Sequence, residues 1–202
     1  REINKILNYD KIQSSLLDIG CATGNFLYVA KRYYKEVYGL EVSTRMATYV
    51  EQKLGIQVFV ETFENLKTDK RFSCIYMSHV IEHIPDPISW LTKAKELLTD
   101  GGVVVLCVPN MFSIGRKIQL FLKKIKLRRG TWEPWRTPDH LFEPNIPGME
   151  KLFRKNDFEI LYYSTYSRSD IIPSTSFGKI INTKLYLGSN LRYIIRPNKK
   201  NF

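Results

Sequence analysis

The sequence predicts a doubly wound α/β fold built on a mostly parallel sheet. Through the first half of the chain, short apolar runs typical of buried strands alternate with longer stretches of helical periodicity. A turn from Gly20 to Gly24 separates the first run from the first helical stretch, and Gly101-Gly102 precedes the fifth run. This alternation is the pattern of successive βαβ units, which place helices on both faces of one sheet.

Length and composition fit one globular domain. The chain has 202 residues, of which 44% are hydrophobic and 25% charged, values that disfavour disordered and fibrous architectures. We therefore expect residues 1–202 to form a single domain. The three cysteines lack the spacing of a disulfide framework or zinc site, so we expect a reducing, cytoplasmic location. No apolar run reaches the ~18 residues that a membrane-spanning helix needs.

The first three strands are predicted by short runs with glycine or polar residues at their ends. Ser15–Ile19 is an apolar run that stops at the glycine turn, and the helical pattern after it covers Phe26–Tyr34. Val37–Leu40 is the second strand, followed by a helix at Thr44–Leu54 and a third strand at Ile56–Val60.

Two further strands complete the regular alternation. Phe72–Met77 is the fourth, and prolines suited to a first helical turn open an amphipathic helix at Pro87–Leu98. The apolar run Val103–Val108 is the fifth strand, which follows the glycine pair.

The alternation stops after Pro109, and we assign residues 111–147 to an insertion. Its first part, Ile114–Leu127, has the periodicity of a basic amphipathic helix. After the insertion we expect a helix at Gly148–Lys155, a strand at Phe158–Tyr163 and a last strand at Leu191–Ile195.

The glycine turn and an acidic residue together predict a nucleoside site. Gly20 and Gly24 let the backbone approach a ligand where a Cβ would collide, and the helix after them presents free N–H groups. Glu41 ends the second strand, where a carboxylate can accept hydrogen bonds from both ribose hydroxyls. The pair indicates a cofactor that contains adenosine.

The spacing of the glycines separates two such cofactors. A dinucleotide fingerprint is G-x-G-x-x-G, whereas Cys21, Ala22 and Thr23 give G-x-x-x-G here. Asp18, two residues before Gly20, is a poor neighbour for a phosphate but suits an ammonium or sulfonium group. The residues therefore favour S-adenosylmethionine over a dinucleotide.

These residues resemble those of class I S-adenosylmethionine-dependent methyltransferases, and the resemblance covers roughly residues 16–158. The segment from Met77 to Pro87 is similar to a motif of the small-molecule subgroup that includes ubiquinone-biosynthesis O-methyltransferases. The resemblance implies a Rossmann-like sheet of about seven strands, the last one antiparallel, with helices on both faces and the basic insertion after the fifth strand. Residues 111–147 would then cap the acceptor side.

The resemblance also implies which residues contact S-adenosylmethionine and its product S-adenosylhomocysteine. Asp18 and Gly20 would hold the methionine end, Glu41 the ribose, and Val42, Thr62 and Phe63 the adenine. Ser78 would line the side where the methyl group is transferred. The full set of implied cofactor contacts is Asp18, Gly20, Cys21, Gly24, Glu41, Val42, Thr62, Phe63 and Ser78.

Histidines are the candidate catalytic groups, because imidazole exchanges protons near neutral pH. His79 follows the fourth strand, where it could accept a proton from an acceptor hydroxyl or only form a wall of the cleft. His140 could contribute to the acceptor pocket or only order the insertion. His79, Glu82 and His83 have the spacing to share a divalent ion on a helical turn, but Pro85 disfavours a regular helix there, and we expect no metal.

The charge of the chain restricts its partners. The net charge is +11, and residues 116–129 carry seven basic residues and no acidic one. That stretch suits an anionic membrane surface or a phosphate-bearing substrate, although a solvated helix face is an equal alternative. No RNA-binding module is recognisable, so we consider nucleic acid unlikely as a partner. The sequence does not indicate the oligomeric state.

We therefore expect a methyltransferase that transfers a methyl group from S-adenosylmethionine to an oxygen of a small molecule such as a sugar, a lipid or quinone-like compound, or another metabolite. Three alternatives stay open: an enzyme acting on tRNA or another RNA, an inactive subunit that keeps the fold, and an oxidoreductase, which NAD(P) binding would reveal. The intact residues of the glycine turn disfavour the inactive subunit.

Overall fold

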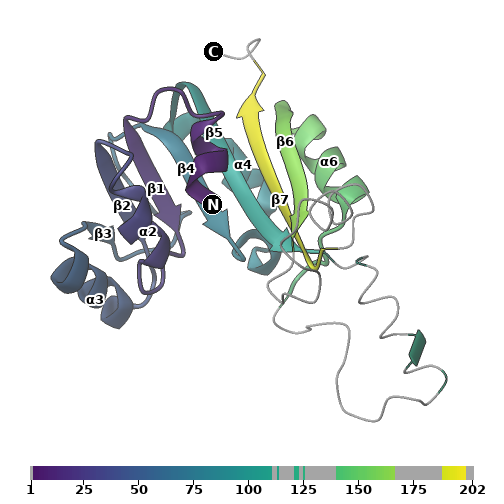
Figure 1. Ribbon diagram of the computed structural model, residues 1–202, viewed down its shortest axis with the longest axis horizontal. Coiled ribbons are helices and arrows are strands. Elements are labelled where there is room, and N and C mark those ends of the chain that lie inside the picture. Colours follow the sequence, from purple (N-terminus) through teal and green to yellow (C-terminus); the bar gives the residue numbers. More distant parts are fainter. Residues whose placement is uncertain are drawn as a thin grey trace.

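A computed structural model contains a seven-stranded sheet with the strand order β3-β2-β1-β4-β5-β7-β6 (Figure 1). The structure describes residues 2–110, 113, 121–122, 125, 140–166 and 188–198. All strand pairs from β3 to β5 are parallel, and β7 runs antiparallel to both β5 and β6. The predicted doubly wound, mostly parallel sheet with its antiparallel last strand is confirmed, and the basic insertion after the fifth strand stays a prediction.

The strands and helices alternate along the chain as the sequence pattern predicts. The strands are β1 (Ser15–Ile19), β2 (Glu36–Leu40), β3 (Val58–Phe59), β4 (Phe72–Ser78), β5 (Leu98–Pro109), β6 (Phe158–Tyr166) and β7 (Asn190–Pro197). The helices are α1 (Glu2–Leu7), α2 (Asn25–Ala30), α3 (Thr44–Leu54), the 3₁₀ turn η1 (Ile81–His83), α4 (Pro87–Leu97) and α6 (Ile146–Lys155).

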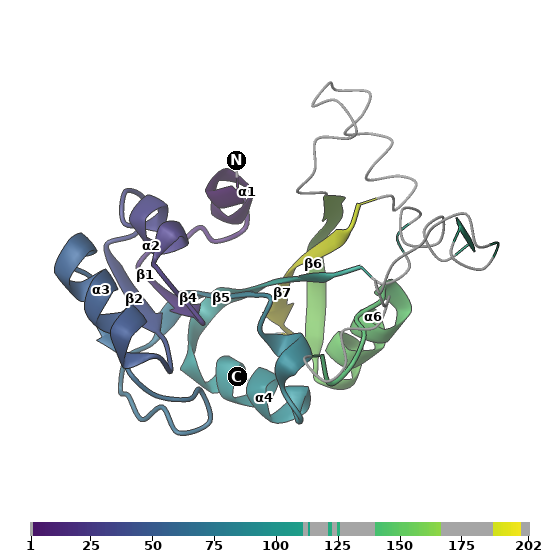
Figure 2. The same cartoon turned by 90° about the horizontal axis from the view of Figure 1, so that it is seen from below.

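Helices cover both faces of the sheet and define two cores. Figure 2 shows α1, α2 and α3 on one face and α4 and α6 on the other. Side chains from α1 to α3 pack with one face of β1, β4 and β5, while Trp90, Leu91 and Phe153 from α4 and α6 pack against the other. Because both faces are buried, the central strands are mostly apolar, as parallel strands usually are, with Asp18 of β1 a buried exception.

Helix ends explain several boundaries. The side chain of Ser43 accepts a hydrogen bond from the Met46 amide, and Gly55 ends α3 in the left-handed conformation. Asp86 accepts bonds from the Ile88 and Ser89 amides at the start of α4. These are the terminal residues that the helical pattern predicts, so α3 matches its predicted bounds and α4 ends one residue early.

Other elements differ in length from their predictions. α2 ends at Ala30 rather than Tyr34, because the chain changes to turns over residues 31–34. β3 has two residues instead of five, since it pairs only with Gly39 and Leu40 at the edge of the sheet. β6 extends to Tyr166, because its pairing with β7 continues to Asn190.

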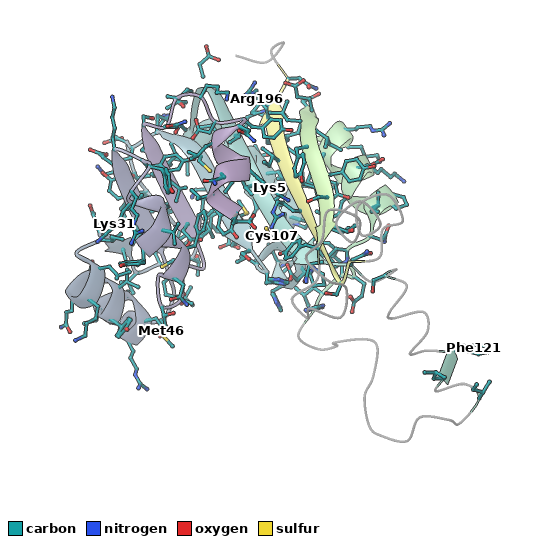
Figure 3. All side chains as sticks on the ribbon, viewed as in Figure 1. Lys5, Lys31, Met46, Cys107, Phe121 and Arg196 are labelled. Atoms are coloured by element: carbon teal, nitrogen blue, oxygen red, sulfur yellow. The ribbon has the colours of Figure 1, made fainter. Side chains whose placement is uncertain are left out.

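The N-terminal helix α1 is an element that the sequence analysis does not predict. It lies over β5 and β7 (Figure 3): Glu2 forms an ion pair with Arg192 of β7, and its Oε1 lies 3.8 Å from the Cys107 sulfur of β5. Ile3 and Ile6 of α1 are buried in the core on that face.

Most of the predicted insertion lies outside the described residues. This applies to the basic helix at Ile114–Leu127 and the charged stretch 116–129, apart from three described positions. One of these, Ile125, donates its amide hydrogen to the carbonyl oxygen of Phe121 at 3.0 Å. Within the parts of the chain that the structure describes, no helix has the length and apolar character to cross a bilayer.

Candidate active site

The glycine turn sits where β1 ends and α2 begins. Gly20 has φ +71° and Gly24 has φ +73°, both in the left-handed region that glycine adopts without strain. A Cβ on Gly20 would lie 2.8 Å from Cγ2 of Val80, and a Cβ on Gly24 would lie 2.8 Å from Leu54 of α3. Gly20 therefore allows the segment after β4 to approach the turn, and Gly24 allows α2 to pack closely on α3.

Glu41 is fixed at the carboxyl end of β2 by two backbone amides. Its Oε2 accepts a hydrogen bond from the Ala22 amide at 2.9 Å, and its Oε1 accepts one from the Ser43 amide at 3.0 Å. Each oxygen keeps a further lone pair for an outside donor. The carboxylate is thus oriented in advance, as the sequence analysis requires for a group that binds a ribose diol.

A cavity of about 260 Å³ opens beside Glu41 at the carboxyl edge of the sheet. Gly20 and Glu41 form one side of it, and Thr62 and Phe63 line it from the loop after β3. Val42 is 67% exposed and also lines the cavity, so an apolar side chain faces open space where a ligand would cover it. Five predicted contact residues are therefore brought together: Gly20, Glu41, Val42, Thr62 and Phe63.

The charge of this cavity distinguishes between ligand classes. Three carboxylates line it, those of Glu41, Glu61 and Glu64, and among the described residues its lining contains no Lys or Arg. The acidic residues make this lining less favourable to a phosphate group than to a neutral or cationic ligand, although the Lys93 ammonium lies 5.6 Å from the Phe63 ring centroid. The geometry agrees with the preference for a nucleoside sulfonium over a dinucleotide.

The remaining predicted contacts lie outside this lining. Asp18 is buried in β1, on the face opposite Leu17 and Ile19; burial, followed by the nearby Glu41 carboxylate, raises its pKa well above the ordinary value. Cys21 is also buried, and burial raises the pKa of its thiol to about 12. Ser78 ends β4 opposite Cys107 of β5.

Several lining residues were missed by the sequence analysis. Val80, Ile84 and Trp90 close the cavity from the segment after β4 and from α4. The indole nitrogen of Trp90 donates a hydrogen bond to Oε1 of Glu64 at 2.6 Å, and the ring stacks at a tilt against Phe63 with centroids 5.0 Å apart. The sequence shows only that these positions are apolar, and a residue of the hydrophobic core has the same character. The sequence pattern therefore cannot distinguish a cavity-lining residue from a core residue.

The first candidate catalytic histidine follows β4 directly. His79 adopts the left-handed conformation with φ 57°, and its amide donates a hydrogen bond to the Cys107 carbonyl at 2.8 Å. Its Nδ1 lies 3.3 Å from Oε1 of Glu82, whose side chain is fully buried. His79 precedes Val80, which lines the cavity, and is not itself one of the lining residues.

The second candidate histidine reaches the same turn from the insertion. His140 is buried, its ring contacts the ring of His83 with centroids 4.9 Å apart, and its Nδ1 lies 3.5 Å from Oε2 of Glu143. The Leu141 amide donates a hydrogen bond to the Glu82 carbonyl at 2.9 Å. The segment that begins at His140 is therefore joined to η1.

The arrangement of these groups differs from the regular helical turn considered above. Residues 81–83 form a 3₁₀ turn, and one side-chain atom each from Glu82, His83 and His140 lies within 4.8 Å of the others. Such a cluster is compact enough to share a cation. The absence of a metal from the reaction stays a prediction.

Strand order, the glycine turn and the carboxylate-lined cavity define a Rossmann-like nucleoside-binding domain of the methyltransferase type. The comparisons agree: residues 1–163 match the family described as methyltransferase domain. The chain belongs to this family.

Known proteins extend the comparison. The chain is 29% identical over 154 residues to a ubiquinone biosynthesis O-methyltransferase of Cereibacter sphaeroides (strain KD131 / KCTC 12085), covering 71% of this chain and 62% of that protein. The chain spans less than two thirds of the length of such curated relatives.

Two solved structures share the fold. An S-adenosylmethionine-dependent methyltransferase from Clostridium acetobutylicum ATCC 824 has a TM-score of 0.66 at 14% identity, covering 98% of this chain and 89% of that one. The plantazolicin methyltransferase BpumL, crystallised with a triazolic desmethylPZN analog and SAH, also has a TM-score of 0.66, at 16% identity, covering 98% of this chain and 84% of that one.

Proposed function

We propose that this chain binds S-adenosylmethionine in the cavity beside Glu41 and transfers its methyl group to an oxygen of a small molecule. The observation that carries the proposal is the Glu41 carboxylate, which two backbone amides orient toward a cavity lined by carboxylates. The similarity to ubiquinone biosynthesis O-methyltransferases and the SAH bound to BpumL support this choice of cofactor.

The chain's own residues would bind the cofactor in three places. Glu41 accepts hydrogen bonds from the ribose hydroxyls, and Val42 and Phe63 offer apolar surface to the adenine. Gly20, without a Cβ, leaves the turn open to the amino-acid end of the cofactor. S-adenosylmethionine supplies an already activated methyl group, so the contribution of the protein is chiefly to align the acceptor and to remove its proton.

Oxygen is the favoured acceptor atom because histidines adjoin the lining residues Val80 and Ile84 along the chain. A hydroxyl group keeps its proton at neutral pH and needs a base in order to attack, whereas a neutral amine already presents a lone pair. His79 is adjacent to Val80 of the cavity lining, and His140 lies in the same cluster.

A transfer assay with S-adenosylmethionine carrying a labelled methyl group tests the proposal. We expect phenol, catechol and sugar hydroxyls to include acceptors, while the matching amines accept at least about tenfold less. Labelling of nitrogen would contradict oxygen transfer. Transfer to RNA with affinity that falls steeply as salt rises would indicate the RNA alternative. Cofactor binding without transfer to any acceptor would indicate an inactive subunit.

A further inference from the structure

A buried carboxylate without a hydrogen-bond donor among the described residues lies in the turn between Val80 and Ile84, two residues of the cavity lining. Glu82 is fully buried, and neither of its carboxylate oxygens has a hydrogen-bond partner among the described residues. Burying an ionised carboxylate without compensation costs several kcal/mol. The closest ion-pairing group is Nδ1 of His79, which lies 3.3 Å from Oε1.

The backbone of His79 is held in one conformation, and the position of its ring is seen separately in the contact of Nδ1 with Glu82. Its left-handed φ of 57° is unusual for a residue with a side chain, and its amide is bonded to the Cys107 carbonyl of the neighbouring strand. Left-handed residues of this kind are concentrated at functional sites, where the surrounding structure offsets their strain. The ring presents Nδ1 to Glu82. The other nitrogen, Nε2, is buried without a hydrogen-bond partner in the part of the chain that the structure describes.

A carboxylate that faces one imidazole nitrogen determines which nitrogen carries the proton. It can only accept a hydrogen bond, so a neutral ring keeps its proton on the nearer nitrogen and leaves a lone pair on the other. The same anion stabilises the imidazolium that forms when the ring takes up a second proton.

We propose that Glu82 is a positioning residue that fixes His79 in the tautomer with its proton on Nδ1, so that Nε2 accepts the proton of the acceptor hydroxyl. This inference rests on the proposed function for its chemistry. In the transfer step, the acceptor oxygen forms a bond to the methyl carbon while the carbon–sulfur bond breaks and leaves its electron pair on sulfur. The hydroxyl proton passes to Nε2 of His79 and then to solvent.

Other titratable groups lie near the Glu82 carboxylate as well. His83 comes from the same turn, and His140, with Glu143 behind it, comes from the end of the insertion. Glu143 lies near His140 as Glu82 lies near His79, three residues away in each case. His79 and His83 adjoin the lining residues Val80 and Ile84, respectively, and His79 is assigned as the base because its Nδ1 lies 3.3 Å from Oε1 of Glu82.

Nitrogen-15 NMR of histidine-labelled protein reads the tautomer without requiring activity. The chain contains only three histidines, and single substitutions of His83 and His140 assign their signals. We expect His79 in the unmodified protein to carry its proton on Nδ1, and Glu82→Gln to abolish that preference. A proton on Nε2 of His79 in the unmodified protein would overturn the proposal by itself, even if no variant folds.

Kinetics supply the second readout. We expect Glu82→Gln to lower kcat by about 100-fold, the lower range for loss of an acid–base group, with the KM for S-adenosylmethionine unchanged. The acidic limb of the kcat/KM profile should move to lower pH, because the imidazolium loses its neighbouring anion. Glu82→Asp should restore part of the rate. Glu150→Gln makes the same chemical change at the partly exposed Glu150, which pairs with the exposed Arg154, and should leave both readouts unchanged.

The outcomes separate this inference from the proposed function. An Nδ1 proton that depends on Glu82, in a protein that methylates no acceptor, would support the positioning role and refute the function. Methyl transfer with an unchanged pH profile in Glu82→Gln would refute the positioning role alone. A divalent ion bound by the unmodified protein and lost in Glu82→Gln would also overturn it, since the carboxylate would then serve that ion.

Discussion

Substitution of Gly20 by alanine tests the geometry of the turn, because the structure separates two costs. Gly20 has φ +71°, and placing an alanine in this left-handed conformation costs about 1–2 kcal/mol. The added Cβ would also lie 2.8 Å from Cγ2 of Val80, and overpacking of this kind costs about 1–3 kcal/mol. We therefore expect Gly20→Ala to lower the free energy of unfolding by about 2–4 kcal/mol.

Two other variants isolate the clash from the backbone strain. Gly55 has a similar φ of +65°, but nothing lies within 4 Å of the position its Cβ would take, so Gly55→Ala should cost only about 1–2 kcal/mol. In a Val80→Ala background, the cost of Gly20→Ala should fall to the same level. Urea unfolding followed by circular dichroism measures all of these changes. Equal costs for Gly20→Ala and Gly55→Ala in the unmodified background would refute the close approach of Val80 to the turn.

Three further variants or treatments test the surroundings of the site. Asp18→Asn should raise the free energy of unfolding at pH 7, because burial and the nearby Glu41 raise the pKa of Asp18 and so penalise its ionised form. The gain should vanish below about pH 4, where folded and unfolded chains both hold the proton. Cys21 should resist alkylation by iodoacetamide at pH 8 until the protein is unfolded, because a thiol with a pKa of about 12 is almost entirely protonated there; rapid labelling of the native protein would contradict this. Ala22→Gly should stabilise the fold by up to about 1 kcal/mol in urea, since Ala22 has φ 47°, and a loss of stability would show that its methyl group makes a needed contact.

The part of the site that lies at the ends of the parallel strands could be predicted from the sequence. Gly20, Glu41 and Val42 lie at strand ends, and in a parallel sheet the carboxyl ends of neighbouring strands meet at one edge. Local pattern and topology were sufficient there. Asp18 was also predicted to contact the cofactor, but it lies outside the cavity lining. Side chains alternate along β1, so Asp18 lies on the opposite face of the sheet from Ile19, and Ile19 is the one that lines the cavity.

Contacts between distant segments could not be predicted. His140 reaches the turn of His83 only because the end of the insertion is hydrogen-bonded to Glu82, and no local pattern indicates that pairing. The ion pair between Glu2 and Arg192 joins residues 190 positions apart. Such contacts depend on how the elements pack, which hydrophobic periodicity does not determine.

The central claim is that the cofactor binds in the cavity beside Glu41. Titration calorimetry with S-adenosylhomocysteine tests this binding most directly, since the product binds without turnover. We expect one site per chain in the unmodified protein and a 10- to 100-fold weaker affinity in Glu41→Ala, about the value of charge-assisted hydrogen bonds. Glu36→Ala, at the other end of β2, should bind as the unmodified protein does. Affinity that Glu41→Ala leaves unchanged, or binding of NAD in place of S-adenosylhomocysteine, would contradict the account.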